Sequence, residues 1–216
     1  MPYAYAVFDG EKNTFEDWGL MLSRVSISDP EPQIITTDIP GRNGPLDLSE
    51  VLTGYMTYKN RKIELEFDAS SSYDEWPALR SKISNYLHGK NRKIIFDNDP
   101  EFYYYGRFTV DHQLSDEATA TVVITGSVDP YKYDAELSEI SLTGAGSKTA
   151  TIYGSRMPVV PTITAATATT ATFNGTTYAV AAGENLIPGV CLVEGENTLV
   201  FAGGGNITIS YRGGSL

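Results

Sequence analysis

Cysteine and histidine are nearly missing from this chain of 216 residues, which contains one cysteine and two histidines. A single thiol, Cys191, cannot form an intrachain disulfide or a zinc cluster built on several thiolates. Two imidazoles cannot supply a three-histidine metal site from one chain. Neither His88 nor His112 lies in a motif typical of a catalytic nucleophile, and we expect both at the surface. The residues therefore predict no catalytic, cofactor-binding or metal-binding set.

Long apolar runs and positive charge are also scarce. No stretch approaches the ~20 apolar residues of a membrane-spanning helix, so we expect no membrane insertion. Acidic residues interrupt the N-terminal segment too early for a secretory signal, which favours synthesis in the cytoplasm without a signal peptide. Sixteen basic residues against 27 acidic ones give a net charge of −11, which repels phosphate. We therefore expect no specific nucleic-acid binding.

Apolar and aromatic residues are abundant enough to build folded domains. They make up 41% and 11% of the chain, which argues against disorder. The composition changes near residue 134, because 11 of the 14 tyrosines precede this point and 12 of the 20 glycines follow it. Pro130 also restricts the residue before it to extended geometry, as suits a strand that leaves a domain. We expect an N-terminal domain of residues 1–134 and a C-terminal domain of residues 135–216.

Period-two alternation predicts mostly strands in the first domain, with Ile63, Leu65 and Phe67 on one buried face. One amphipathic helix is expected near residues 73–88, packed on that sheet. Its apolar stripe at helical spacing consists of Trp76, Leu79, Ile83, Tyr86 and Leu87. The start of the helix has two interpretations. Residues 72–75 have the form of a capping box, whereas Pro77 favours a start nearer Asp74 or Trp76.

The second domain is predicted to be a small antiparallel sandwich of seven short strands. The β-rich runs cover residues 148–153, 160–164, 171–174, 176–180, 183–187, 197–201 and 206–211. Asn174-Gly175 is the strongest hairpin pattern in the chain. The fold class is therefore mainly β: an N-terminal β-sandwich with one amphipathic helix, followed by a small C-terminal β-sandwich.

Two loops allow a functional and a structural interpretation. Residues 97–101 present alternating carboxylates, as a calcium loop does, but they lack the glycine and distal glutamate of an EF-hand. We expect an acidic hairpin turn there. Residues 144–149 superficially resemble a phosphate loop, but Ser147 stands where that motif requires glycine before the lysine. We expect a linker or turn.

One segment of the first domain is unsuited to a core strand, because residues 41–49 contain two glycines, a proline and a charged pair. We expect an extended arm or loop that contacts the neighbouring subunit, with Arg42 pairing with an acid across the interface. The candidate contact residues are Gly41, Arg42, Asn43, Gly44, Pro45, Leu46 and Asp47.

Several short segments of the first domain form an ordered set. They are Gly41-Arg42-Asn43-Gly44-Pro45-Leu46-Asp47-Leu48-Ser49, residues 58–67, Ser72-Tyr73-Asp74-Glu75-Trp76, Leu87-His88-Gly89, residues 93–97, residues 103–107 and Asp129-Pro130-Tyr131-Lys132-Tyr133. As an ordered set, covering about residues 1–134, they resemble the distal tail proteins of long-tailed, non-contractile bacteriophages and prophages. The match of the remaining residues is much weaker.

The resemblance implies a structural virion protein rather than an enzyme. It implies a hexameric ring at the distal end of the tail, which joins the tail tube protein to the tail-tip or baseplate protein. The ring would also be the hub for receptor-binding proteins, and the C-terminal sandwich would be galectin-like. Two other functions remain open from the residues: a carbohydrate-binding module acting through the C-terminal sandwich, and a small hydrolase acting through carboxylates.

Overall fold

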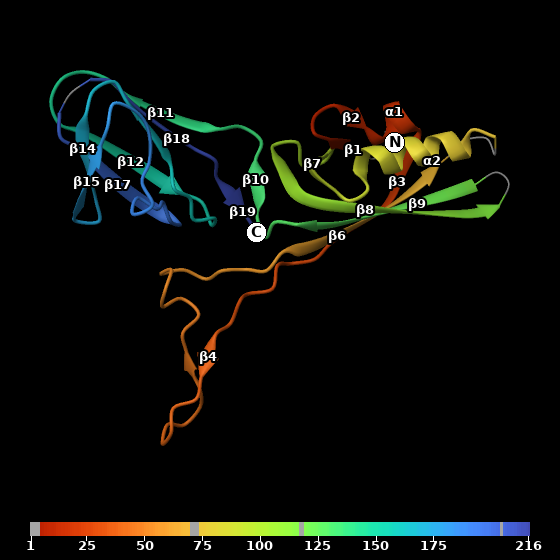
Figure 1. Ribbon diagram of the computed structural model, residues 1–216, viewed down its shortest axis with the longest axis horizontal. Coiled ribbons are helices and arrows are strands. Elements are labelled where there is room, and N and C mark those ends of the chain that lie inside the picture. Colours follow the sequence, from red (N-terminus) through yellow and green to blue (C-terminus); the bar gives the residue numbers. More distant parts are fainter. Residues whose placement is uncertain (1–4, 70–73, 117–118, 204) are drawn as a thin grey trace. The chain divides into compact units, whose positions relative to one another are not determined.

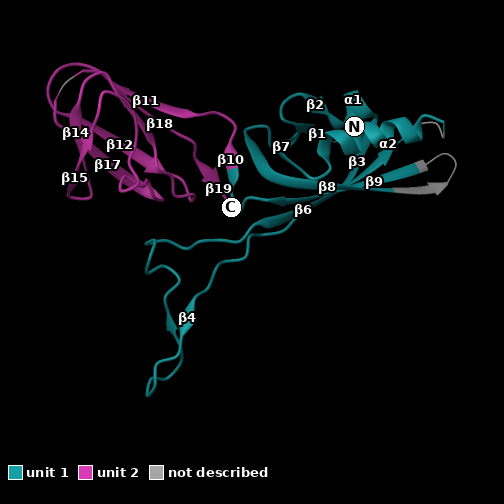
Figure 2. Ribbon diagram, viewed as in Figure 1, with its two compact units in different colours: residues 1–132 teal, residues 133–216 magenta. Residues whose placement is uncertain are grey.

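The computed structural model describes residues 5–69, 74–116, 119–203 and 205–216. The chain divides into two compact units, residues 1–132 and 133–216, which Figure 2 colours separately. The division falls at residue 132, whereas the sequence places the domain boundary at 134. Both units are built mainly from antiparallel strands, which confirms the predicted fold class.

Unit 1 is built on a sheet with the strand order β2-β1-β7-β8-β9-β6-β3. The strands are β1 (Ala6–Phe8), β2 (Lys12–Asn13), β3 (Leu20–Ile27), β6 (Arg61–Ala69), β7 (Lys90–Phe96), β8 (Phe102–Asp116) and β9 (Thr119–Val128). Helices α1 (Thr14–Trp18) and α2 (Trp76–Leu87) lie on the same side of β8, β9 and β6 (Figure 1). Helix α1 is an addition to the single helix that the sequence predicts.

The inner faces of these strands and of α2 share one core. The alternation predicted for β6 is confirmed, because every second side chain along it is buried. Fully or almost fully buried members are Ile63, Leu65 and Phe67 from β6 and Trp76, Ile83 and Leu87 from α2, with Leu79 packed at the margin. The helix therefore packs on the sheet as expected.

Helix α2 begins at Trp76, with Glu75 at the N-cap position and no capping bond from a side chain. Pro77 then stands in the first turn, where its missing N–H removes no helical hydrogen bond. The later of the starts considered from the sequence is therefore correct. Ser72 and Tyr73 of the alternative capping box lie outside the described residues.

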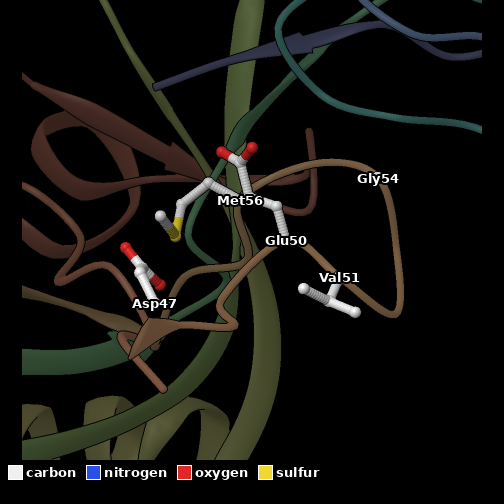
Figure 3. Close-up of a pocket in the computed structure, with 5 residues that line it drawn as sticks. All are labelled: Asp47, Glu50, Val51, Gly54 and Met56. Atoms are coloured by element: carbon white, nitrogen blue, oxygen red, sulfur yellow. The ribbon is translucent and has the colours of Figure 1, made fainter. Parts of the chain in front are cut away.

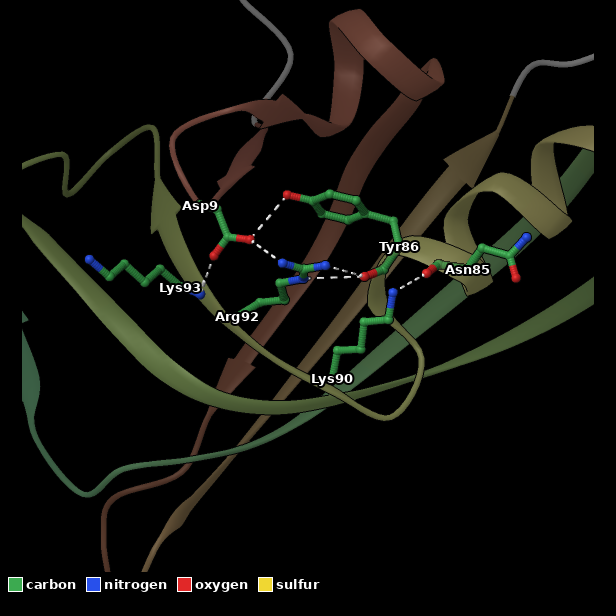
Figure 4. Close-up of polar contacts among 6 residues, drawn as sticks. All are labelled: Asp9, Asn85, Tyr86, Lys90, Arg92 and Lys93. Atoms are coloured by element: carbon green, nitrogen blue, oxygen red, sulfur yellow. Dashed lines mark hydrogen bonds and ion pairs between the residues drawn. The ribbon is translucent and has the colours of Figure 1, made fainter.

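A polar cluster fixes the end of α2 (Figure 4). The Asp9 carboxylate accepts hydrogen bonds from the Tyr86 hydroxyl at 3.1 Å, the Arg92 guanidinium at 2.9 Å and the Lys93 backbone N–H at 2.9 Å. Arg92 also donates to the Tyr86 carbonyl and lies 4.4 Å from the centre of its ring. Burial and the Asp9 charge raise the pKa of Tyr86 to about 12. The cluster thus joins the β1–β2 turn, α2 and β7.

Both histidines tie α2 to β8. His88, which follows the helix, accepts the Val110 N–H at Nδ1 over 3.1 Å. His112 lies on β8, with Nε2 at 2.9 Å from the Ser84 hydroxyl oxygen and its ring 5.8 Å from that of Trp76. His112 is half-buried, so the expectation of a surface position is wrong for it, because this part of β8 faces the helix.

The buried environment of His112 predicts a loss of stability in mild acid. Burial, followed by the positive charge of Arg80, lowers the pKa of His112 in the folded chain. The unfolded chain binds a proton near pH 6.5, so the stabilisation is complete above this pH and is lost as the pH falls through the lower folded-state pKa. The free energy of unfolding, measured with urea between pH 8 and 5, should depend less on pH for His112→Gln than for wild type. Equal slopes would contradict the prediction.

Unit 2 consists of two four-stranded sheets, ordered β11-β18-β13-β16 and β12-β17-β14-β15, whose inner side chains form one core. The strands are β11 (Ser138–Leu142), β12 (Lys148–Gly154), β13 (Thr162–Ala165), β14 (Thr169–Phe173), β15 (Thr176–Val180), β16 (Gly183–Leu186), β17 (Gly195–Phe201) and β18 (Ile207–Tyr211). In addition β10 (Lys132–Asp134) pairs with β19 (Gly214–Ser215). All seven strands expected from the sequence are present.

The Asn174-Gly175 hairpin is also confirmed. Both residues have positive φ, 47° and 76°, and they connect β14 to β15. A two-residue turn with this geometry matches the twist of the strands it joins. The ambiguous loops are turns as well: the Asp99 N–H donates to the Phe96 carbonyl at 3.1 Å, and residues 143–147 link β11 to β12.

The motif Gly-Glu-Asn opens both β16 and β17, and each asparagine makes the same bonds. Its amide oxygen accepts a hydrogen bond from the N–H of the residue four positions earlier. Its amide NH2 donates to the carbonyl of that same residue, to the carbonyl of the motif's glycine and to a carbonyl on a neighbouring strand. The partners are Ala181, Gly183 and Ile163 for Asn185, and Val193, Gly195 and Ile152 for Asn197.

Burial makes the second of these asparagines the more important. Asn197 is 4% exposed, so Asn197→Ala removes the acceptor of the Val193 N–H and the donor to the carbonyl of Ile152, which is itself 1% exposed. We expect a loss of about 1–3 kcal/mol in the free energy of unfolding, measured with urea. Asn185→Ala is the matched control and should cost less, because Asn185 is only half-buried and water can replace its amide. Equal losses would contradict the role assigned to burial.

The basic side chains of unit 2 are bonded to the unit itself. The Lys148 ammonium donates to the Gly205 carbonyl, and Arg212 donates to the Asp134 and Ala135 carbonyls. Arg156 forms an ion pair with Glu194 at 2.7 Å. These three are all the lysines and arginines in residues 133–216. Among the described residues, the exposed carboxylates of unit 2 with no ion pair to a basic side chain belong to Glu136, Glu139, Glu184 and Glu196.

Candidate subunit-contact arm

Residues 28–60, here called the arm, leave the sheet between β3 and β6 and fold back on themselves (Figure 1). At its base the Ser28 N–H donates to the Lys62 carbonyl at 3.0 Å. Farther out, the Gln33 N–H donates to the Thr57 carbonyl and the Lys59 N–H to the Glu31 carbonyl, both at 2.8 Å. Backbone bonds therefore hold the two sides of the arm together as a hairpin.

The outer part of the arm is a short two-stranded sheet of β4 (Thr36–Thr37) and β5 (Leu46–Asp47). Ser49 supports it, because its hydroxyl oxygen accepts the Ile35 N–H at 2.9 Å. The Asp47 carboxylate accepts from both the hydroxyl and the backbone N–H of Ser49. These hydrogen bonds lower the pKa of Asp47 and keep it ionised.

The candidate contact residues of the sequence lie at the outer end of this hairpin. Gly41, Arg42, Asn43, Gly44 and Pro45 lie in the loop from β4 to β5, and Leu46 and Asp47 form β5. Gly41 and Gly44 have φ of 83° and 77°, which only glycine adopts at little cost. Every residue from 31 to 45 is exposed. The segment is thus available to a partner, and contact with a neighbouring subunit stays a prediction.

The arm also carries apolar residues that the sequence prediction missed. Ile34, Ile35, Ile39, Val51 and Leu52 are exposed by 66%, 53%, 42%, 68% and 92%. Several large apolar side chains exposed on one segment are typical of a site of association. For Ile34, Ile35 and Ile39 the signal in the sequence was their occurrence among four prolines, Pro30, Pro32, Pro40 and Pro45, where no core strand can form.

A shallow pocket of about 570 Å³ lies on the return side of the arm (Figure 3). Its lining combines two carboxylates with apolar side chains, namely Asp47, Glu50, Val51, Gly54 and Met56. Acidic and apolar groups together suit an incoming side chain that has an apolar stem and a positive head.

The described ranges contain neither a cluster of metal-ligating side chains nor a helix that could cross a membrane. No group of three or more His, Cys, Asp or Glu side chains there could hold a metal ion. The helices in the same ranges are too short or too polar to cross a membrane. The arm, an exposed extension of unit 1 that carries apolar side chains, is the candidate site.

No protein-family model and no curated protein sequence matches the chain. Among solved structures it is similar to that of the SPP1 Dit (gp 19.1) protein, described as a paradigm of the hub adsorption apparatus in phages that infect Gram-positive bacteria. The match covers 99% of both chains with a TM-score of 0.69 and 16% identity. It confirms the resemblance to phage distal tail proteins at the level of the fold, and it extends that likeness to unit 2.

Proposed function

We propose that the chain is a structural component of a phage tail tip. Six copies form a closed ring that joins the tail tube protein to the tail-tip protein and acts as the hub for receptor-binding proteins. The observation that carries the proposal is the full-length likeness of the fold to SPP1 Dit, at 99% coverage of both chains. The role is structural rather than enzymatic, and the protein acts in the tail of the virion.

The arm supports this assignment. A closed ring of identical subunits uses a heterologous contact, in which one surface of each copy binds a different surface of the next copy. An exposed hairpin with five exposed apolar residues is suited to be the surface that each copy presents to its neighbour. Burying these side chains between subunits would stabilise the ring by about 25 cal/mol for each Å² of apolar surface removed from water.

The native mass of the full chain tests the proposal. Light scattering over a concentration series should reveal a species of six times the 23.5 kDa monomer mass, and electron microscopy should show rings. A chain that stays monomeric at every concentration, also in the presence of tail tube protein, would contradict the ring.

Arg42 provides a sharper test of the arm. Its side chain is exposed at the tip, so Arg42→Glu should leave the free energy of unfolding within ~0.5 kcal/mol of wild type. The same change should weaken assembly at physiological salt, because it places an acid against the acid expected on the neighbour. Lys82→Glu on α2 makes the same change of charge away from the arm and serves as control. Normal assembly of Arg42→Glu would remove this role of Arg42.

Carbohydrate binding through the C-terminal sandwich is the second function raised by the sequence. Sugar sites usually combine an aromatic platform with polar groups. In the described part of unit 2 one large aromatic side chain is strongly exposed, Tyr153 at 73%, paired across strands with Glu196. Binding of a neutral glycan, lost in Tyr153→Ala while the ring persists, would add this function to the structural one.

A further inference from the structure

The chain contains two Asn-Gly pairs, Asn43-Gly44 and Asn174-Gly175, and both asparagines are exposed. In such a pair the backbone nitrogen of the glycine can attack the side-chain amide carbon of the asparagine, because glycine has no Cβ to hinder the approach. The asparagine then loses its amide without an enzyme. The two pairs have the same reacting groups but differ in backbone structure, so the fold decides which of them reacts.

The reaction passes through a cyclic imide and needs only water. The glycine nitrogen loses its proton to water or hydroxide and forms a bond to Cγ of the asparagine, the bond from Cγ to the amide nitrogen breaks, and ammonia leaves after taking up a proton. Water then opens the imide. Attack at Cγ yields aspartate, and attack at the backbone carbonyl yields isoaspartate, in which the chain continues through the side chain. Either product carries a negative charge that asparagine lacks.

The hairpin holds the second pair in a geometry that opposes this reaction. Asn174 has a φ of 47°, the left-handed conformation that its two-residue turn requires. Beside the turn Phe173, 3% exposed, pairs with Thr176, and the hydroxyl oxygens of Thr172 and Thr177 lie 3.0 Å apart across the next pair. Ring closure needs the glycine nitrogen within about 3–3.5 Å of Cγ, and hence a rotation of the asparagine backbone. At Asn174 this rotation breaks the turn.

The first pair lies at the tip of the arm, where the backbone is held by fewer contacts. It belongs to the loop of residues 38–45 between β4 and β5, in which every residue is exposed. No hydrogen bond of the Asn43 backbone is present among the described residues, and Asn43 is not in the left-handed conformation. A Cβ atom at Gly44 would meet no atom within 4 Å, so the space around its nitrogen is open. Asn43 can therefore rotate into the geometry of ring closure without breaking a turn.

We propose that Asn43 is a site of spontaneous deamidation at the arm tip and that the hairpin protects Asn174. The product adds a negative charge to a loop in which the exposed charges of Asp38 and Arg42 balance. The loop has room for the extra backbone atom of isoaspartate, whereas a two-residue turn has none. The arm tip thus becomes more acidic as the free protein ages, while the fold is kept. The inference goes beyond the proposed ring, because the reaction needs no neighbouring subunit.

The rates of the two sites in one preparation test the proposal. The full chain is incubated at mildly basic pH, dilute enough for light scattering to show monomers, and its peptides are analysed by mass spectrometry for replacement of the amide NH2 by OH. Asn43 should react about tenfold faster than Asn174 or more, which corresponds to a difference of ~1.4 kcal/mol between the activation barriers. Incubation in urea is the control, because unfolding removes the hairpin and should bring the two rates together.

Three results would overturn the inference. Equal rates at Asn43 and Asn174 in the folded chain would show that the hairpin gives no protection. A gap that persists unchanged in urea would show that the neighbouring residues, and not the fold, set the two rates. A rate at Asn43 no higher than that at Asn206, which is exposed and precedes Ile207 instead of a glycine, would show that the arm tip holds no reactive site.

Asn43→Asp reproduces the charge of the product, and Asn43→Gln, which keeps a neutral amide, is its matched control. Both variants should have the free energy of unfolding of wild type, because the core of unit 1 contains no residue of the arm tip. Asn43→Asp should assemble more weakly than Asn43→Gln, since the new acid stands beside Arg42, and this expectation rests on the proposed ring. Equal assembly of the two variants would show that the charge of the tip does not act on the ring. A wild-type chain that forms no ring contradicts the proposed function, whereas the two deamidation rates still decide the inference.

Discussion

Gly106→Ala should destabilise unit 1 by about 3 kcal/mol or more, near the upper limit of overpacking effects. Gly106 lies on β8 opposite Val128 of β9. A Cβ atom there would stand 2.2 Å from the Ser127 carbonyl oxygen and 2.4 Å from the Val128 Cα. Both are backbone atoms of the adjoining strand, so relief requires separation of β8 from β9 in the middle of the sheet.

Urea unfolding of the purified variant measures this effect, and Gly126→Ala is its control. The Cβ of that alanine would meet the Phe108 ring at 2.6 Å, and a ring can rotate where a carbonyl of a paired strand cannot. The loss at Gly126 should therefore be the smaller of the two. A Gly106→Ala variant within ~1 kcal/mol of wild type would show that β8 and β9 can separate at little cost.

Removal of the outer arm should abolish assembly and spare the fold. The Gln33–Thr57 backbone bond brings the two sides of the arm together, so a short glycine-rich turn can replace residues 34–56. The core of unit 1 contains no residue of the arm among its buried members, which is why the free energy of unfolding should stay at the wild-type value. The deletion removes the five exposed apolar residues together with Asp38 and Arg42.

Light scattering and urea unfolding of the deletion variant provide the two readouts. Rings that form with the wild-type concentration dependence would show that assembly uses another surface. Loss of folding would show that the arm supports the sheet from which it extends. The expected result is a folded chain that forms no rings. Arg42→Glu should lose part of the assembly that the deletion abolishes.

The sequence predicts those parts of the fold in which a short window determines the structure. Alternation over seven residues placed Ile63, Leu65 and Phe67 on one face, and the same faces are buried. Asn174-Gly175 specified its hairpin because the two residues tolerate positive φ. Helix α1 was missed because its five residues are too few for a helical period to be visible.

The parts that escaped prediction depend on contacts between distant segments. His112 is on a strand whose local pattern is polar, and its burial comes from α2, about thirty residues earlier in the chain. Arg61 stands at a strand end, yet it is 4% exposed, and its guanidinium carbon lies 5.6 Å from the centre of the Tyr104 ring, more than forty residues later in the chain. For the arm, the glycines and the proline indicated an extended segment, but the exposure of Ile34 and Leu52 follows from the pairing of β3 with β6, which excludes the segment between them from the sheet.

The excess of carboxylates in unit 2 has a kinetic consequence. Residues 133–216 contain six acidic residues and three basic ones, a net charge of −3, so the outward electrostatic field of the unit is set by exposed carboxylates such as Glu139 and Glu184. A negative field slows the diffusional approach to polyanions and favours encounters with neutral or positively charged partners. Added salt screens that repulsion beyond ~8 Å at physiological ionic strength, so it would accelerate collisions of this unit with polyanions, the reverse of the salt effect on a basic adhesin.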